Sequence, residues 1–329
     1  MFENYLNKRY LKIIESGDFE KIGNLIKKRS NNFSEEVQIA LLKKGICVNL
    51  FIELATNLCP EALKLIIKNG ITTDICYVIK HNNITEELER LIIARGIDSE
   101  QTALVQKGLL FQSSVSEIIA CKNHKAIMAL LEKITAFSKL RITEEDKDKI
   151  IFNDNPEEIR AFFKHSFLPS EKSILHLIEV GNVEAVIAAL SINCQYYTPF
   201  SKKIIETVLD KGGEQMVFAM LRQTKKLLSQ LKQMHKSLDW LEQAILARGN
   251  KDEISMLARI YPISEPTIYK ILERGNKQEI KAIIDNDSLD DEFVFNLINS
   301  RRYDLLENYA RYTADKYLYM LANFIKKHS

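Results

Sequence analysis

The chain has 329 residues, which is enough for about two ordinary domains or for one repeat array. Its 46 basic and 44 acidic residues leave a net charge of +2, which excludes a strong overall field for nucleic acid or an anionic membrane. With only 11 Gly and 6 Pro, the composition favours a mostly helical fold. Five widely spaced Cys, no leader-like N-terminus and no apolar run of ~20 residues predict a cytoplasmic protein with free thiols.

One turn pattern recurs along the chain and predicts a stack of helical hairpins. A helix end is followed by Gly or a substitute residue, then usually by Asn, and then by Glu-Ile at the start of a new apolar stripe. The pattern is plainest at 247–254 and again at 273–280. Most turns lie about 26 residues apart, a period typical of helical repeats. In chain order the turn positions are Gly17, Gly45, Gly70, Gly96, Lys122, Asp154, Gly181, Gly212, Gly249, Gly275 and about Arg301.

The residue types of this turn explain why two helices meet there. A Gly just past a helix end takes the left-handed conformation that closes off the last carbonyls. The following Asn caps the next helix through its side-chain oxygen, and a Glu three residues later completes a capping box. Lys122, Asp154 and Arg301 are expected to take the place of Gly at three of the turns.

The remaining elements complete the prediction in chain order. We expect an N-terminal cap over 1–16, an enlarged repeat over 212–248 with one long helix over about 214–234, and a C-terminal cap over 301–329. Counted from its turn Gly, each unit has a second turn with its own helix-start signals. Ser34, Thr85, Thr143, Ser170 and Ser264 are caps before acidic residues, and Cys59-Pro60 and Thr198-Pro199 place Pro in the first turn of a helix. Helices of about ten residues are too short to be stable alone, so they must be stabilised by stacking.

These observations together predict an all-α fold. The expected architecture is a right-handed or curved α-solenoid of about eleven helix-turn-helix repeats, forming a single continuous array over residues 1–329. The segment Ala-Leu-Lys-Leu-Ile-Ile-Lys-Asn-Gly at 62–70 is similar to the second helix of an ankyrin repeat. Nearly the whole chain resembles the α-solenoid class that includes HEAT and ankyrin arrays, although its common unit is shorter. The resemblance implies an architecture and no particular function.

Motifs that carry chemistry are not recognisable in the sequence. It contains no Gly-x-Gly-x-x-Gly or Gly-Lys-Ser/Thr for nucleotides and no Gly-x-Ser-x-Gly for a nucleophile. Its His and Cys residues lack the spacing of metal ligands. The sequence therefore predicts a non-enzymatic protein without cofactor or metal. An enzyme of unrecognised type, with its site in a groove between repeats, is the alternative.

The enlarged repeat offers the first candidate surface for a partner. Five cations and the single Trp of the chain lie close together there: Arg222, Lys225, Lys226, Lys232, Lys236 and Trp240. The simpler interpretation is the solvated face of an amphipathic helix. The functional interpretation is a surface for an unidentified protein or peptide, which makes the chain an interaction scaffold. Nucleic-acid binding by the basic helix over 222–236 is a further alternative, and no membrane role is expected.

The C-terminal repeats offer a second candidate surface, rich in tyrosine. Its members are Tyr303, Tyr309, Tyr312, Tyr317 and Tyr319, with Arg301, Arg302 and Arg311 beside them. Amphipathic aromatics suit the outer side of a terminal repeat. We therefore expect these residues to cap the array, with partner binding as the second interpretation.

Overall fold

All regular structure in the described part of the chain is helical. The computed structural model describes residues 2–108, 110–134, 140–195, 200–226, 239–261, 263–286, 291–313 and 316–328. These ranges contain 23 α-helices and one 3-10 helix, and they contain no strand. The all-α prediction is confirmed. The chain forms two compact units, unit 1 (residues 1–165) and unit 2 (residues 166–329).

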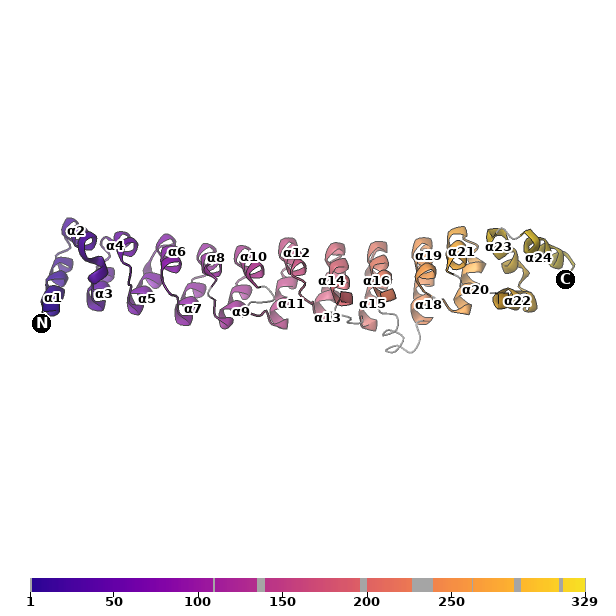
Figure 1. The fold of residues 1–329 in the computed structure, drawn as a ribbon, viewed down its shortest axis with the longest axis horizontal. Helices are drawn as coiled ribbons and strands as arrows, with labels where there is room; N and C mark the ends of the chain where they lie inside the picture. Colours follow the sequence, from indigo (N-terminus) through magenta and orange to yellow (C-terminus); the bar gives the residue numbers. More distant parts are fainter. Residues whose placement is uncertain are drawn as a thin grey trace. The chain divides into compact units, whose positions relative to one another are not determined.

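Unit 1 has two layers of helices, formed by the first and second helices of successive hairpins (Figure 1). From α1 to α10, each helix packs against the helix two places further along the chain, and in every hairpin except that of α3 and α4 the two helices also pack closely against each other. The first helices are α1 (Phe2–Glu15), α3 (Glu35–Lys44), α5 (Pro60–Asn69), α7 (Glu86–Ala94), α9 (Gln112–Ala120) and α11 (Glu144–Phe152). The second helices are α2 (Phe19–Arg29), α4 (Val48–Leu54), α6 (Thr72–His81), α8 (Asp98–Lys107), α10 (His124–Lys133) and α12 (Pro156–Lys164). The 3-10 helix η1 (Ser30–Asn32) follows α2.

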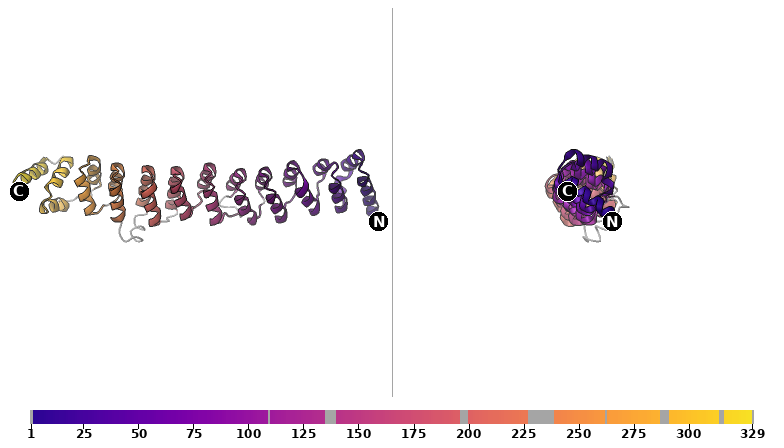
Figure 2. Two further views of the ribbon diagram at one scale, coloured as in Figure 1. Left: turned by 180° about the vertical axis from the view of Figure 1, so that it is seen from behind. Right: turned by 90° about the vertical axis from the view of Figure 1, so that its left-hand side faces the viewer.

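The hairpins of unit 2 also follow one another in chain order (Figure 2). The two helices of each hairpin pack together, and the second helices of successive hairpins contact one another. Its first helices are α13 (Glu171–Glu179), α15 (Lys202–Lys211), α18 (Asp239–Arg248), α20 (Glu265–Arg274) and α22 (Asp291–Asn299). Its second helices are α14 (Val183–Gln195), α16 (Glu214–Lys226), α19 (Lys251–Ile260), α21 (Lys277–Asp285) and α23 (Tyr303–Thr313), followed by α24 (Lys316–His328). Sequential packing of neighbouring hairpins is consistent with a helical repeat.

The core of each unit comes from aliphatic residues at helical spacing. On α10, for example, Ile127, Leu130 and Leu131 are fully buried, and Ile280 and Ile283 are fully buried on α21. Burial of one such side chain stabilises the fold by roughly 1.5–3 kcal/mol. Because a short helix has no stability of its own, this burial against neighbouring hairpins holds it in place.

Most of the predicted turn positions have a left-handed backbone, with or without Gly. The φ angle is +71° at Gly249 and +66° at Gly275, and it is +57°, +53° and +58° at Lys122, Asp154 and Arg301. Repeat register therefore predicts the conformation even where the residue type opposes it. The Asn caps are confirmed as well: the Asn276 side chain accepts hydrogen bonds from the backbone N–H groups of Gln278 and Glu279. Asn250 does the same for α19.

Two of the predicted turns are different. Gly70 and Gly212 both have φ of −74° and an extended backbone. Their N–H groups bond to the carbonyls of Ile66 and Val208, four residues earlier, so no left-handed residue is needed to close the helix. Gly is still required, because a Cβ would lie 2.5 Å from the Ile66 carbonyl oxygen at Gly70 and 2.4 Å from the Val208 oxygen at Gly212.

The predicted capping boxes are replaced by a different device, which we call the arginine clasp. An Arg just before the turn Gly pairs with the Glu five residues later, in Arg95–Glu100, Arg248–Glu253 and Arg274–Glu279. The Nε–Oε2 distances are 2.9, 2.8 and 3.0 Å, and all three carboxylates are fully buried. Each guanidinium also donates to the backbone of the preceding hairpin. Arg95 donates to the Ile67 and Gly70 carbonyls, and Arg274 to the Gly249 carbonyl. The clasp therefore joins successive repeats.

The predicted caps and enlarged repeat are described in part. The N-terminal segment is helical as α1, and the C-terminal segment contains α23 and α24. In the enlarged repeat α16 is described as far as Lys226, and the rest of the predicted long helix lies outside the described residues, as does the predicted cap Thr198. None of the described helices has the length and hydropathy of a membrane-spanning segment.

Candidate interaction surfaces

The cationic surface predicted in the enlarged repeat is only partly described. Arg222 is exposed on α16, and Lys225 and Lys226 belong to the last turn of that helix. Lys232 and Lys236 lie outside the described residues. Trp240 is half-buried on α18, where the Lys202 ammonium lies 5.2 Å from its ring centroid. The described residues thus do not bring the predicted set together, and this surface stays a prediction.

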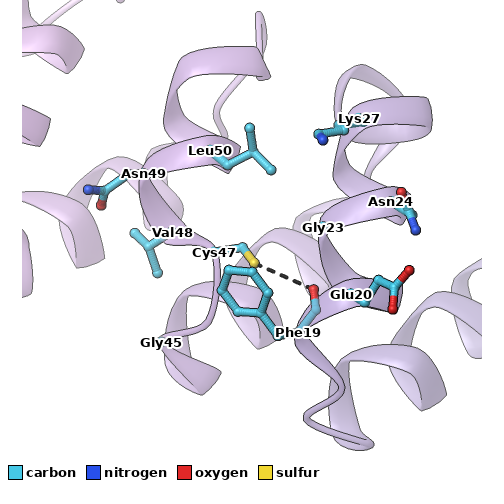
Figure 3. A pocket seen from close by; sticks show the side chains of 10 residues that line it. All are labelled: Phe19, Glu20, Gly23, Asn24, Lys27, Gly45, Cys47, Val48, Asn49 and Leu50. Atoms are coloured by element: carbon cyan, nitrogen blue, oxygen red, sulfur yellow. Dashed lines mark hydrogen bonds between the residues drawn. The ribbon is translucent and has the colours of Figure 1, made fainter.

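A different site, an open groove between α2 and α4 in unit 1, is well described (Figure 3). Its volume is about 540 Å³, which is within the ~300–1,000 Å³ range of small-molecule and side-chain sites. The groove is lined by Phe19, Glu20, Gly23, Asn24, Lys27, Gly45, Cys47, Val48, Asn49 and Leu50. We call it the α2–α4 groove.

The turn before α4 explains why space is left there. Gly45 ends α3 with a left-handed backbone, but no Asn cap follows it. Instead Cys47 is itself left-handed, with φ of 55°, and α4 begins only at Val48. The helix is therefore 7 residues long, shorter than the 10 residues of α6 and α8. A shorter helix covers less of its neighbour α2.

The floor of the groove is Gly23, in the middle of α2. A Cβ built at Gly23 would meet only the Cys47 sulfur, at 4.0 Å, so the backbone of α2 is left open there. The Cys47 thiol lies 3.8 Å from the Phe19 carbonyl oxygen, which fixes the turn against the first residue of α2 (Figure 3). Gly lowers the intrinsic stability of a helix interior by about 1 kcal/mol relative to Ala. Neither backbone conformation nor close packing requires it at this position.

The rim of the groove combines an exposed aromatic ring with a cation. Phe19 is 71% exposed, although it is a large apolar residue, and Val48 and Leu50 are half-buried beside it. Lys27 extends from α2 toward Leu50 across the groove (Figure 3). At the other end of α2, hydrogen bonds from Lys21 lower the pKa of the capping residue Asp18. That carboxylate is thus already paired.

The tyrosine-rich C-terminal segment forms a second exposed apolar surface on α24. One face of this helix, represented by the fully buried Ala322, packs toward α23. The other face exposes Tyr319, Met320, Leu321 and Phe324. The Arg311 guanidinium lies 6.0 Å from the Tyr319 ring centroid, as a mixed aromatic–cationic patch requires. Within the described part, α24 is therefore apolar on two sides.

Comparisons of the chain with protein-family models, with curated proteins and with solved structures find no match. Function must therefore be argued from the surfaces alone. The sequence contained one overlooked signal for the α2–α4 groove, the isolated Gly23 inside an apolar helical stripe. Such a Gly costs helix stability and often has a packing or functional reason.

Proposed function

We propose that the chain is a non-enzymatic scaffold that presents helical-repeat surfaces to a protein or peptide partner. In this proposal the same repeat runs through both units, as a right-handed or curved α-solenoid of about eleven helix-turn-helix repeats. The observation that carries the proposal is the α2–α4 groove, an open apolar site with an exposed aromatic rim. Exposed apolar surface with a polar border is typical of protein-binding sites.

The interior of the repeats supports this proposal. The polar groups of the arginine clasps are engaged with one another and with backbone carbonyls, so they hold the repeats together. Repeat proteins with such self-sufficient joints use the surface of the stack for recognition. The apolar face of α24 and the cationic segment at 222–236 are further candidate surfaces.

Affinity capture with the tagged full-length chain tests the proposal. Wild type is compared with Gly23→Leu, which fills the groove, with Met320→Glu/Phe324→Glu on α24, and with Lys225→Glu/Lys226→Glu/Lys232→Glu in the cationic segment. We expect wild type to retain a reproducible set of proteins and at least one variant to lose members of it. A captured set identical for wild type and all three variants would refute a scaffold that uses these surfaces.

A further inference from the structure

We infer that the α2–α4 groove binds an acidic peptide segment that inserts one or two apolar side chains between α2 and α4. The inference rests on the proposed scaffold function and names the chemistry of its partner. Two features of the groove lead to it. One is its apolar lining, and the other is Lys27, which extends toward α4 without an ion pair to another described residue, whereas the carboxylate of Glu20, the acidic residue of the lining, points away from α4 (Figure 3).

The apolar lining of the groove favours apolar side chains of a partner over a small charged ligand. Phe19, Val48 and Leu50 line an opening whose floor is the Gly23 backbone. Covering apolar surface there removes it from water, and the gain in binding rises with the area covered. An aliphatic or aromatic side chain gains the most from this site, since it covers the exposed Phe19 ring and the Gly23 backbone together.

The positive charge at the groove favours a negatively charged partner. Lys27, Lys28 and Arg29 are consecutive, exposed and form no ion pair with another described residue. They lie in the last turn of α2, where the helix dipole accounts for part of their stabilisation. Lys27, however, lines the groove and points across it (Figure 3). A carboxylate that flanks the inserted side chain would meet Lys27, while Lys28 and Arg29 add positive charge to the same end of α2. Complementary charges of this kind set specificity and association rate.

Nucleic acid is the competing occupant, because phosphates also pair with Lys and Arg. The lining favours a peptide: a nucleic-acid site needs cations along a track, whereas here one cation lines an opening that is mainly apolar. An uncharged apolar peptide would use the lining but leave Lys27 unpaired. An acidic apolar peptide uses both features.

Peptide display with the immobilised full-length chain tests the inference. A random 12-residue library is selected on wild type and counter-selected on Gly23→Leu, in parallel with oligo-dT and oligo-rU binding at ~50 mM salt, where phosphate contacts are strongest. We expect the enriched peptides to carry at least two Asp or Glu beside Leu, Ile or Phe. No enrichment, an enriched set without an acidic bias, or binding of the oligonucleotides alone would overturn the inference.

Variants of matched size and charge then locate the site. A fluorescent enriched peptide should bind Gly23→Leu at least tenfold more weakly than wild type, whereas Gly23→Ala, which improves the same helix but barely narrows the groove, should bind it nearly normally. Lys27→Glu should weaken binding several-fold and reduce its salt dependence. Lys125→Glu on α10 makes the same charge change outside the groove and should leave binding unchanged. Equal affinity for wild type, Gly23→Leu and Lys27→Glu would exclude the groove as the binding site.

The two proposals fail in different ways. If display finds no groove-dependent peptide but α24 or cationic-segment variants lose captured proteins, the scaffold stands and the acidic-peptide inference falls. If groove-dependent acidic peptides are found and Gly23→Leu also loses captured proteins, both stand. If such peptides are found but the captured sets are identical, the scaffold proposal falls.

Discussion

Two joints of unit 1 perform the same task with different residues. At the turn before α8, Arg95 pairs with the buried Glu100 and donates to carbonyls of the preceding hairpin. At the turn before α12, Asn153 occupies the position of that Arg, and Glu158 occupies the position of Glu100. There His124 of the preceding hairpin lies 3.1 Å from Glu158, and Asn153 also donates to it. The buried Glu is kept, and its main hydrogen-bonding partner comes from a different helix.

The difference shows which part of the joint is fixed. The carboxylate is buried at both turns, while its partner is an arginine that is 22% exposed in one case and a histidine that is 37% exposed in the other. A buried carboxylate without a partner is costly, so each repeat that keeps the Glu must also supply a cation or donors. Unit 2 uses the arginine form twice, at Arg248 and Arg274.

Breaking the arginine joint should have the largest effect. Arg95→Ala leaves the Glu100 carboxylate buried without its cation and frees the Ile67 and Gly70 carbonyls. We expect a loss of about 3–5 kcal/mol in the free energy of unfolding, measured by urea denaturation with circular dichroism. His124→Ala should lower the free energy of unfolding by only about 1–2 kcal/mol, because Asn153 still donates a hydrogen bond to Glu158.

A paired substitution is the control for this prediction. Arg95→Met/Glu100→Leu removes both charges together, so it should restore a large part of the stability lost in Arg95→Ala. Two results would contradict this explanation. One is an equal loss in the free energy of unfolding for Arg95→Ala and His124→Ala, and the other is a double variant that is no more stable than Arg95→Ala. Either result would show that the unpaired buried carboxylate does not cause the loss of stability.

A second pair of positions extends the comparison to both units. Glu89 on α7 and Glu242 on α18 are buried at the same place in their repeats, and each accepts a hydrogen bond from the N-cap N–H of the next first helix, Phe111 or Ser264. Glu242 also accepts from the Ser264 hydroxyl. Burial raises the pKa of Glu89 despite hydrogen bonds from Ser114 and Phe111. Gln38 occupies the equivalent place on α3, where its Oε1 accepts from the Cys59 N–H at 2.9 Å.

We therefore expect Glu89→Gln to stabilise the chain at neutral and higher pH by about 1 kcal/mol. A carboxyl group whose pKa is raised by folding stabilises the fold fully only below its unfolded pKa of about 4.3, and this contribution is lost as pH rises through the folded value. Glu89→Gln carries no ionisable group at this position, so its stability does not fall for this reason as the pH rises. Unfolding free energies measured between pH 4 and pH 9 should show wild type losing stability relative to Glu89→Gln as the pH rises.

Glu242→Gln is the matched control and should have the opposite sign. Both oxygens of the Glu242 carboxylate accept hydrogen bonds from Ser264, whereas the Glu89 Oε1 accepts none from the described residues. An amide nitrogen therefore replaces a used acceptor at Glu242 but an unused one at Glu89, and Glu242→Gln should lower the free energy of unfolding by about 1 kcal/mol at neutral pH. If the difference in unfolding free energy between wild type and Glu89→Gln did not change with pH, Glu89 would not be the group that titrates. Stabilisation by both substitutions would show that the unused Glu89 oxygen does not determine the sign.

The sequence predicts the turns well because their determinants are local. Asn250 and Asn276 act through N–H groups two and three residues away, so residue type and spacing suffice to identify them. The left-handed backbone at Asp154 and Arg301 follows from register alone. The fold class depends on such local signals and on helical apolar spacing.

The joints and the groove escape prediction because their partners are distant in sequence. Arg95 and Glu100 are five residues apart, which is not a pairing distance on one helix, and Ile67 lies a full repeat upstream. The α2–α4 groove results from a short helix and a Gly on a neighbouring helix, two features that are each unremarkable alone. The cationic surface predicted at 222–236 was identified by composition, and the described residues include only part of it.

The smallest expected effect concerns the turns themselves and compares Lys122 with Gly96. Both end a first helix of unit 1 with a left-handed backbone, at φ of 57° and 69°. For a residue with a Cβ, this conformation raises the free energy of the folded state by about 1–2 kcal/mol. Gly removes this strain, but it also increases the conformational entropy of the unfolded chain, which cancels part of the gain. Lys122→Gly should therefore raise the free energy of unfolding by about 0.5–1 kcal/mol. Gly96→Ala should lower it by a similar amount, since an added Cβ meets nothing within 4 Å and the φ angle alone acts. Thermal unfolding of the two variants beside wild type measures both changes in stability. If both substitutions stabilise or both destabilise the chain, backbone conformation does not determine stability at these turns.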